Sequence, residues 1–150
     1  MENTIQKHQQ YINGKWVDST GRSWWTVKSP ATGDVLAEVP LGSAEDVDRA
    51  VEAAQKARRV MADMNVFDRS KLLMAIADEI EKAREEIAHD LAQEQGKPYQ
   101  AEALGEIDAG IAMWRDAAEI IKHLGSEVLP SSDSAKRIHT IRQPMGVYGV

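Results

Sequence analysis

The sequence predicts an α/β fold, with short strands in the first third of the chain and helices through most of the rest. Two patterns indicate this division. Short apolar runs alternate with turn residues before Ser43, whereas apolar side chains recur at helical spacing from Ser43 to Leu124. The chain has 150 residues, of which 43% are hydrophobic and 28% are charged. This length and composition are typical of one folded domain and not of a disordered segment.

Two pairs of strands are predicted in the first third. In residues 11–17, the dipeptide Asn13-Gly14 separates two apolar pairs, and both residue types tolerate the positive φ of a type I′ turn. A second pair comprises residues 24–28 and 35–39, with a Ser-Pro-Ala-Thr-Gly-Asp turn between them. Pro40 and Gly42 are expected to close this strand region. Adjacent strand residues point to opposite faces, so the two tryptophans of residues 24–28 are expected to divide between the core and an edge.

Helices are predicted from Ser43 onward, where Ser43 and Asp46 resemble a capping box. A second helix is expected to begin near Asp68 and to run on as one stretch through Leu91. It ends at Gly96, which can adopt the left-handed conformation and is followed by Lys-Pro. The third predicted helix spans residues 99–124 and has the most regular apolar stripe, made of Ile107, Ile111, Trp114, Ala118, Ile121 and Leu124. Residues 137–142 are expected to be extended, and a further apolar run begins at Val147.

Composition and charge exclude several classes of function. The 24 acidic and 18 basic residues give a net charge of −6, which disfavours a nucleic acid as the main partner. The sequence has no apolar run long enough to span a membrane, and its first residues lack the apolar region of a secretory signal. The chain contains no cysteine, which excludes a disulfide and a thiol nucleophile within these residues. A cytoplasmic location is therefore expected.

The residues alone show no catalytic constellation. No two of the four histidines have the spacing that would place both on one metal ion, and no Gly-x-Gly-x-x-Gly motif occurs. The polar loop at 131–134 lacks the glycines of a nucleophile elbow. Neighbouring carboxylates such as Glu85 and Glu86 are interpreted as a solvated helix face. We therefore expect no catalytic and no cofactor-binding residue in this chain.

Four short segments stand out by their order and spacing. They read Tyr-Ile-Asn-Gly-Lys-Trp-Val at 11–17, Ser-Pro-Ala-Thr-Gly-Asp-Val-Leu-Ala-Glu-Val-Pro at 29–40, Glu-Gln-Gly-Lys-Pro at 94–98 and Gln-Pro-Met-Gly-Val at 143–147. In this order they resemble the beginning of an NAD(P)-dependent aldehyde dehydrogenase. The resemblance covers the chain from about Gln10 onward, and only about the first third of such an enzyme. One departure is Arg59–Met64, where the family usually carries a tryptophan.

The resemblance implies the hairpins and helices of a Rossmann-like cofactor-binding domain in residues 1–124. It implies an oligomerisation arm that adds a strand to a neighbouring subunit in 125–144, and the start of a cofactor-domain strand in 145–150, where the chain ends. A homodimer or homotetramer is therefore expected. The implied activity is oxidation of an aldehyde to a carboxylic acid with NAD or NADP, both bound mainly by residues beyond 150. The thiohemiacetal-forming cysteine also lies beyond residue 150, so the 150-residue piece alone is expected to be inactive.

Two sites are implied in this chain by the same resemblance. Some family members hold a structural monovalent cation, and the matching residues here are Val27, Lys28 and Glu94; the alternative for Glu94 is a helix cap. The third helix approaches the substrate tunnel in the family, which makes Ala109, Met113 and Trp114 candidates for contact with the aldehyde. Because Trp114 lies on the apolar stripe, core packing is the alternative for it.

The resemblance also suggests a substrate subgroup, and a non-catalytic function is the alternative to an enzyme. Gly105-Glu106-Ile107, Lys136-Arg137 and Gln143-Pro144 look most like the succinate-semialdehyde type of the family. The alternative to an enzyme is a non-catalytic interaction module derived from the same segment, which would use residues 125–144 to bind a partner. The intact mass of the protein made from its native gene distinguishes the two, because the catalytic cysteine needs a longer chain.

Overall fold

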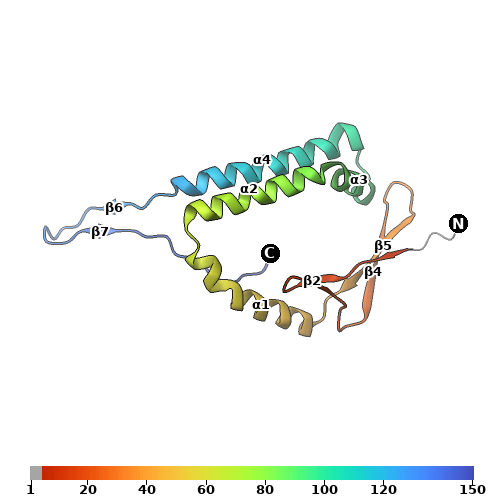
Figure 1. Ribbon diagram of the computed structural model, residues 1–150, viewed down its shortest axis with the longest axis horizontal. Helices are drawn as coiled ribbons and strands as arrows, with labels where there is room; N and C mark the ends of the chain where they lie inside the picture. The colour runs from red at the N-terminus through yellow and green to blue at the C-terminus, as the bar shows by residue number, and fades with distance from the viewer. Residues whose placement is uncertain (1–4) are drawn as a thin grey trace.

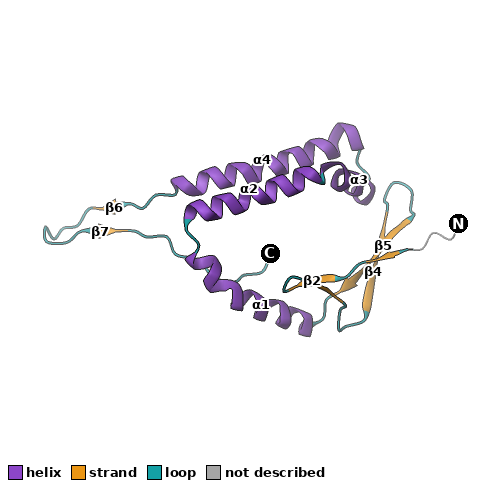
Figure 2. Ribbon diagram, in the orientation of Figure 1, coloured by secondary structure: helices purple, strands orange, loops and turns teal. Residues whose placement is uncertain are grey.

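The computed structural model describes residues 5–150, so the first four residues of the predicted 1–124 region lie outside it. The strands are β1 (Gln6–Lys7), β2 (Gln10–Ile12), β3 (Lys15–Val17), β4 (Ser23–Lys28), β5 (Val35–Leu41), β6 (Val128–Leu129) and β7 (Ile138–His139). The helices are α1 (Ala44–Asp63), α2 (Val66–Lys82), α3 (Arg84–Gln95) and α4 (Leu104–Ile120), with a π-helical turn at Tyr99–Ala103 and a 3-10 turn at Ile121–His123. The predicted succession of strands and then helices is confirmed (Figure 2).

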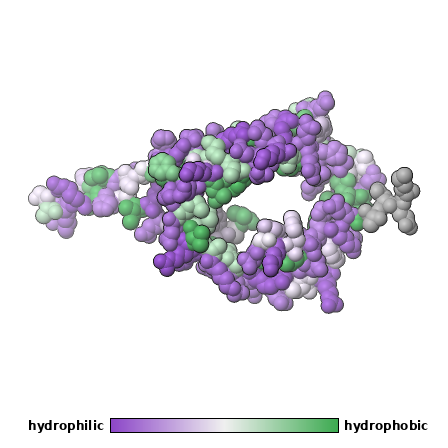
Figure 3. Space-filling view, in the orientation of Figure 1, coloured by the Kyte–Doolittle hydropathy of each residue, from purple (hydrophilic) through white to green (hydrophobic). Residues whose placement is uncertain are grey.

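The elements form an open ring with one long projection (Figure 1). Helices α2 and α4 lie side by side along one side of the ring, α1 lies along the other, and the N-terminal strands close one end. The opening passes through the molecule in the space-filling view (Figure 3). The structure exposes 11847 Å² of surface, whereas a compact monomer of this mass would expose about 7,600 Å². Much of the apolar surface of the elements therefore has no partner within the described residues.

The first predicted hairpin is confirmed. Strands β2 and β3 pair antiparallel, with Tyr11 opposite Trp16. Asn13 and Gly14 take φ values of 53° and 75° in the turn between them, as a type I′ turn requires. The rings of Tyr11 and Trp16 contact each other on the exposed face of the hairpin, with their centroids 5.1 Å apart.

The second predicted strand pair is also confirmed, and a third strand joins it. β5 pairs antiparallel with β4 on one side and parallel with the short β1 on the other. β5 ends at Leu41, directly before Gly42, so the predicted close of the strand region at Pro40 and Gly42 is confirmed, although Pro40 itself still lies within the strand, opposite Trp24. β1 pairs only with Ala37 and Glu38, so the sheet at Pro40 has a neighbour on one side only, where proline is tolerated.

The expectation that one of the two tryptophans of β4 lies in the core is wrong. Trp24 and Trp25 are both exposed, Trp25 the more so. The Lys7 ammonium lies 4.9 Å from the centre of the Trp24 ring, so a cation covers this ring where a core would otherwise have done so.

The capping box at the start of α1 is confirmed, and it extends further than predicted. The Asp46 carboxylate is buried and accepts hydrogen bonds from the Ser43 backbone N–H at 2.9 Å and from the Ser19 hydroxyl at 2.6 Å. The Thr20 backbone N–H and the Arg49 guanidinium also donate to it. These hydrogen bonds, that from Ser19 above all, hold the pKa of Asp46 well below its usual range. Asp46 therefore joins the loop after β3 to the first turn of α1.

The corner between α1 and α2 is held by Asn65, which precedes α2, and by Arg69 of α2. Asn65 caps α2 and accepts hydrogen bonds at 3.0 Å from the backbone N–H groups of Phe67 and Asp68. The last turn of α1 contains no basic residue. Instead, the guanidinium of Arg69 in the first turns of α2 donates at 2.6 Å to the carbonyl of Met61 in α1. A positive charge is favourable at the C-terminal end of a helix, and for α1 this charge is supplied by Arg69 of α2.

The prediction of one continuous helix through Leu91 is wrong. α2 ends at Lys82 and α3 begins at Arg84, because Ala83 takes φ −95° and ψ 9°. The Arg84 guanidinium forms a two-pronged ion pair with Asp108 of α4, which fixes the new direction of the chain. The end of α3 at Gly96 is as predicted, with the left-handed φ of 72°.

Residues 99–124 are helical almost throughout, as predicted, although the first turn is π-helical and the last is a 3-10 turn. Ala77 of α2 and Ile111 and Ala118 of α4 are buried. β6 and β7 form a separate hairpin that projects from the ring (Figure 1). Residues 145–150 belong to no strand, and their prediction as the start of a strand stays a prediction, since a strand needs a neighbour to pair with.

Candidate functional site

A concavity of about 450 Å³ lies between α3 and the three-stranded sheet. Val27, near the end of β4, and Glu94, near the end of α3, both line it. Lys28, the third residue of the predicted cation site, is not among the residues that line this concavity. The structure therefore brings together two of the three predicted residues.

The backbone at Val27 differs from that of a regular strand. The register between β4 and β5 shifts between Val27 and Lys28. Such an irregularity takes backbone groups out of the ladder of hydrogen bonds. A backbone carbonyl here and the Glu94 carboxylate are both hard oxygen donors, the kind of ligand that hard cations take. The donor types thus fit a structural cation.

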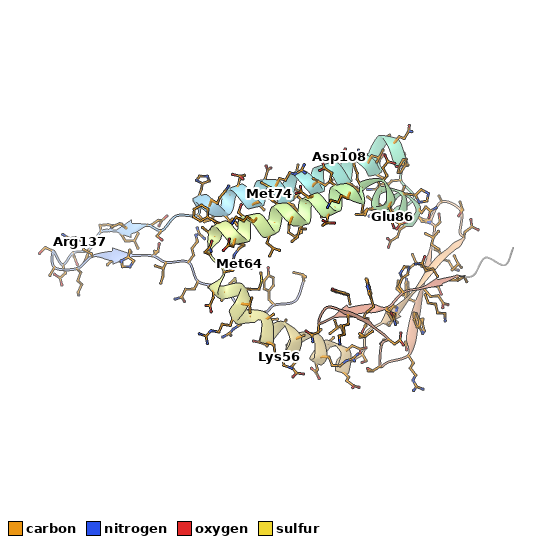
Figure 4. The ribbon with its side chains drawn as sticks, viewed as in Figure 1. Lys56, Met64, Met74, Glu86, Asp108 and Arg137 are labelled. Carbon is orange, nitrogen blue, oxygen red and sulfur yellow. The ribbon has the colours of Figure 1, made fainter. Side chains whose placement is uncertain are left out.

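Further carboxylates face the same concavity. Glu86 and Asp90 line it together with Glu94, each four residues from the next along α3, and Figure 4 shows Glu86 on the side of α3 nearest the strands. Glu85 and Glu86 are both exposed, as predicted for a solvated helix face, and the spacing of four residues is the only sign in the sequence that Glu86, Asp90 and Glu94 share one side of α3. Among residues 5–150, no three or more His, Cys, Asp or Glu side chains are grouped as metal ligands. A cation here would therefore depend on backbone carbonyls.

The Ser29–Gly33 turn, which follows β4, packs against the end of α3 beside this concavity. The turn closes through hydrogen bonds from the Gly33 N–H to the Ser29 carbonyl at 2.8 Å and from the Ser29 N–H to the Asp34 carbonyl at 2.9 Å. A Cβ atom on Gly96 would lie 2.9 Å from Cγ of Pro30. Gly96 thus allows the approach of the turn that holds the end of β4 beside the end of α3.

The predicted tunnel residues lie on the exposed side of α4. Met113 is 70% exposed, and Ala109, one turn earlier, is also exposed. Trp114 is 38% exposed, so packing within the described residues covers it only in part. Ile111 and Ala118 are the members of the predicted stripe that are buried. Ala109 and Met113 therefore form one apolar strip without a partner in the described residues.

The predicted arm contains the hairpin of β6 and β7. Leu129 lies opposite Ile138, and the Thr140 backbone N–H donates to the Glu127 carbonyl at 2.9 Å. Val128 and Ile141 are largely exposed. Each strand has one edge that pairs with no other described strand, and such edges can accept a strand from another chain.

No helix of the described chain is both long enough and apolar enough to cross a lipid bilayer.

Comparison with known proteins gives one consistent result. The model of the aldehyde dehydrogenase family matches residues 16–150. Malonate-semialdehyde dehydrogenase 1 of Geobacillus kaustophilus (strain HTA426) is 39% identical over 146 residues, which is 97% of this chain and 29% of the relative. The chain thus spans less than a third of the length of that curated relative.

Two solved structures are similar in fold as well as in sequence. Succinate-semialdehyde dehydrogenase from Burkholderia pseudomallei superposes with a TM-score of 0.86 at 34% identity, covering 97% of this chain and 30% of the other. An NADP-dependent enzyme from E. coli superposes with a TM-score of 0.82 at 29% identity, covering 89% of this chain and 28% of the other. The predicted α/β segment of a Rossmann-like protein is confirmed. This chain belongs to the aldehyde dehydrogenase family.

Proposed function

We propose that the protein to which this chain belongs is an NAD(P)-dependent aldehyde dehydrogenase that oxidises an aldehyde to a carboxylic acid. The observation that carries the proposal is the family match over residues 16–150, together with a similar course of the backbone in dehydrogenases of known structure. The test is an assay of the protein made from its native gene for aldehyde-dependent formation of NADH or NADPH. Absence of product with either cofactor over a panel of aldehydes would refute the proposal.

The proposed substrate is a semialdehyde. The relative from Geobacillus kaustophilus acts on malonate semialdehyde by its name, and the structure from Burkholderia pseudomallei is that of an enzyme for succinate semialdehyde. A semialdehyde carries a carboxylate that an unsubstituted aldehyde lacks. We therefore expect a higher kcat/KM for malonate or succinate semialdehyde than for propanal and butanal. Equal values for charged and uncharged aldehydes would contradict this substrate class.

The chain itself supports the reaction but does not carry it out. It contains no cysteine, and the proposed reaction needs a thiolate that attacks the aldehyde carbon. When bound, the nicotinamide supplies the hydride acceptor. We propose that residues 1–150 form part of the cofactor-binding domain and one wall of the substrate passage. The isolated 150 residues are therefore expected to be inactive; activity in this piece would refute that division.

The alternative is a non-catalytic interaction module, since an exposed hairpin is also what such a module would present. The intact mass of the protein from its native gene separates the two. A mass near 16.6 kDa would favour the module, and a mass about three times larger would favour the enzyme. A cytoplasmic location accompanies the enzyme proposal, because a catalytic thiolate persists in a reducing compartment.

The proposed structural cation is monovalent and lies between Val27 and Glu94, with Lys28 contributing through its backbone. The support is the concavity shared by Val27 and Glu94 and the irregular backbone at Val27. Exchange of Na⁺ and K⁺ for the bulky choline cation should lower the unfolding temperature of the enzyme, and Glu94→Gln should abolish that difference. An unfolding temperature that does not depend on the cation would refute the site.

The proposed substrate passage is lined by Ala109 and Met113, with Trp114 at its side. Removal of the Met113 side chain should open space and raise kcat/KM for bulky aldehydes relative to small ones. Met113→Ala is compared with Val60→Ala, which truncates an exposed apolar residue on α1. If the two variants discriminate between benzaldehyde and propanal alike, Met113 does not line the passage.

The proposed arm assembles the enzyme as a homodimer or homotetramer through residues 125–144. Val128→Lys and Ile141→Lys place charges on exposed apolar positions at the hairpin. We expect these variants to dissociate the assembly in light scattering. An unchanged mass for both variants would show that the hairpin does not form the subunit contact.

A further inference from the structure

Helices α2 and α4 approach each other through small residues. Ala77 of α2 and Ala118 of α4 are fully buried, and Ser70 of α2 is buried as well. Small side chains allow two helices to approach closely, since the separation of the axes depends on the side chains at the contact. A methyl group offers little to resist sliding or rotation of one helix along the other. Ile111 of α4 is also buried and resists such movement in part, and charged contacts at the edge of the interface add to this restraint.

Charged side chains beside this contact supply such a restraint. The Arg115 guanidinium of α4 donates to Oε2 of Glu81 at 2.8 Å and to Oδ1 of Asp78 at 3.1 Å, and its second nitrogen lies 3.4 Å from Oε1 of Glu81. Asp78 and Glu81 lie one turn apart on α2. A planar guanidinium that engages two successive turns restricts both the axial position and the rotation of α4.

A second ion pair fixes the same face of α4 near its other end. Arg84, the first residue of α3, donates to both oxygens of Asp108, at 2.5 and 2.7 Å. Figure 4 shows Asp108 at the end of α4 nearest α3. Asp108 and Arg115 are seven residues apart and so lie within about 20° of each other around the helix. Two anchors seven residues apart therefore hold one face of α4.

The proposed tunnel residues lie on the opposite face. At 3.6 residues per turn, Met113 projects about 160° and Ala109 about 120° away from Arg115. A side chain at position 115 thus reaches no substrate that contacts Met113. Any effect of Arg115 on the substrate must pass through the placement of α4 itself.

We propose that Arg115 is a positioning residue: by binding Asp78 and Glu81 it sets the rotation of α4 and thereby places Met113 and Ala109 against the aldehyde. This inference rests on the proposed substrate passage. It assigns substrate discrimination to an ion-pair network located on the far side of the helix. Loss of the Arg115 contacts lets the part of α4 beyond Asp108 turn or slide along α2, while the Arg84–Asp108 ion pair still holds the part before it, and the passage loses its fixed width at Met113.

The test compares Arg115→Ala, Glu81→Ala and the double variant in the protein made from its native gene. We expect each single variant to change the ratio of KM for benzaldehyde to KM for propanal by about threefold to tenfold, with kcat for propanal retained. Because Arg115→Ala already removes every contact of the guanidinium, the double variant should match Arg115→Ala, whereas Glu81→Ala leaves the hydrogen bond to Asp78 and should have the smaller effect of the two. Arg115→Lys should restore the ratio only in part, since an ammonium cannot form the fork.

Lys71→Ala is the matched control, because its ion pair with Asp68 lies within α2 and does not join two helices. A ratio for Lys71→Ala as strongly changed as that for Arg115→Ala would overturn the proposal. So would additive effects of the two alanine variants. If Arg115→Ala fails to fold, the charge-exchanged pair Arg115→Glu with Glu81→Arg serves instead; it should bring the ratio closer to the wild-type value than Arg115→Glu alone does, with recovery incomplete because the carboxylate at position 115 still faces Asp78. No recovery relative to Arg115→Glu would overturn the proposal.

Met113→Ala distinguishes failure of this inference from failure of the proposed passage. If Met113→Ala changes the ratio and Arg115→Ala does not, the passage stands and the positioning role is refuted. If neither variant changes it, both are refuted. A changed ratio in both supports the positioning of Met113 by Arg115.

Discussion

A single methyl group added at Gly96 should push the end of α3 away from the Ser29–Gly33 turn, which follows β4. In Gly96→Ala, the alanine would have to adopt a φ of 72°, and its Cβ atom would lie 2.9 Å from Cγ of Pro30. The left-handed conformation costs about 1–2 kcal/mol for a residue with a side chain. The proline ring has little freedom to move away, so the close contact adds about 1 kcal/mol to this cost. The expected loss of local stability is therefore about 2–3 kcal/mol.

Gly33→Ala is the matched control for this prediction. Gly33 has a similar φ of 79°, but nothing lies within 4 Å of the position its Cβ would occupy. It should therefore cost only the conformational strain of about 1–2 kcal/mol. Adding Pro30→Ala to Gly96→Ala removes Cγ of Pro30 and should reduce the loss to the value for Gly33→Ala.

The assay is hydrogen–deuterium exchange at the backbone amides of the Ser29–Gly33 turn and the last turn of α3. A loss of 2–3 kcal/mol corresponds to amide exchange that is about 30- to 150-fold faster where exchange follows local opening. If Gly96→Ala accelerates exchange no more than Gly33→Ala does, the turn does not pack on α3 as described. The proposed cation site would then lose the contact that brings Val27 to Glu94.

Three further predictions concern the helices, each measured by thermal unfolding of the protein at fixed protein concentration. Asp46 keeps a lowered pKa in the folded protein, so its negative charge stabilises the fold at pH values above 3.8, its ordinary pKa, and this contribution is lost as the pH falls below 3.8. Asp46→Asn should therefore lessen the fall in unfolding temperature below about pH 4. Curves of unfolding temperature against pH that run parallel for the variant and the wild type would contradict the reasoning. Asn65→Ala removes the cap of α2 and should cost about 1 kcal/mol, whereas a neutral result would mean that water replaces the cap without loss. Ala118→Leu overfills the contact between α2 and α4 and should cost about 1–3 kcal/mol; a stabilised variant would show that the contact is loosely packed.

The parts of the fold that the sequence predicts well depend on residues with strict local requirements. Asn13-Gly14 adopts the positive φ values that only a few residue types tolerate, and Gly96 ends α3 in the same way. Ser43 and Asp46 form a capping box that uses only groups within three residues of each other. These features need no information about the rest of the molecule, so the sequence pattern suffices.

The parts that the sequence does not predict depend on contacts between distant residues. Alanine is the strongest helix former, so the residue type at position 83 does not predict that the helix is interrupted there. That break accompanies the ion pair between Arg84 and Asp108, which are 24 residues apart. The polar residues of β1 likewise have no strand pattern in the sequence, because they form a strand only through parallel pairing with β5.

The candidate sites divide in the same way. Resemblance to the family led to Val27 and Glu94, and the structure places both at one concavity. Glu86 and Asp90 complete the acidic face of that concavity, and only their spacing on α3 could have indicated them. The role proposed for Arg115 needed the structure, because no pattern in the sequence pairs it with Asp78 and Glu81.

The hydrogen bond from Arg69 to the Met61 carbonyl has a consequence for how the two helices open. Because a side chain of α2 satisfies the last carbonyls of α1, fraying of either helix at the corner removes a partner from the other. The corner therefore couples the two helices into one cooperative unit. The end of α1 and the start of α2 open together or not at all.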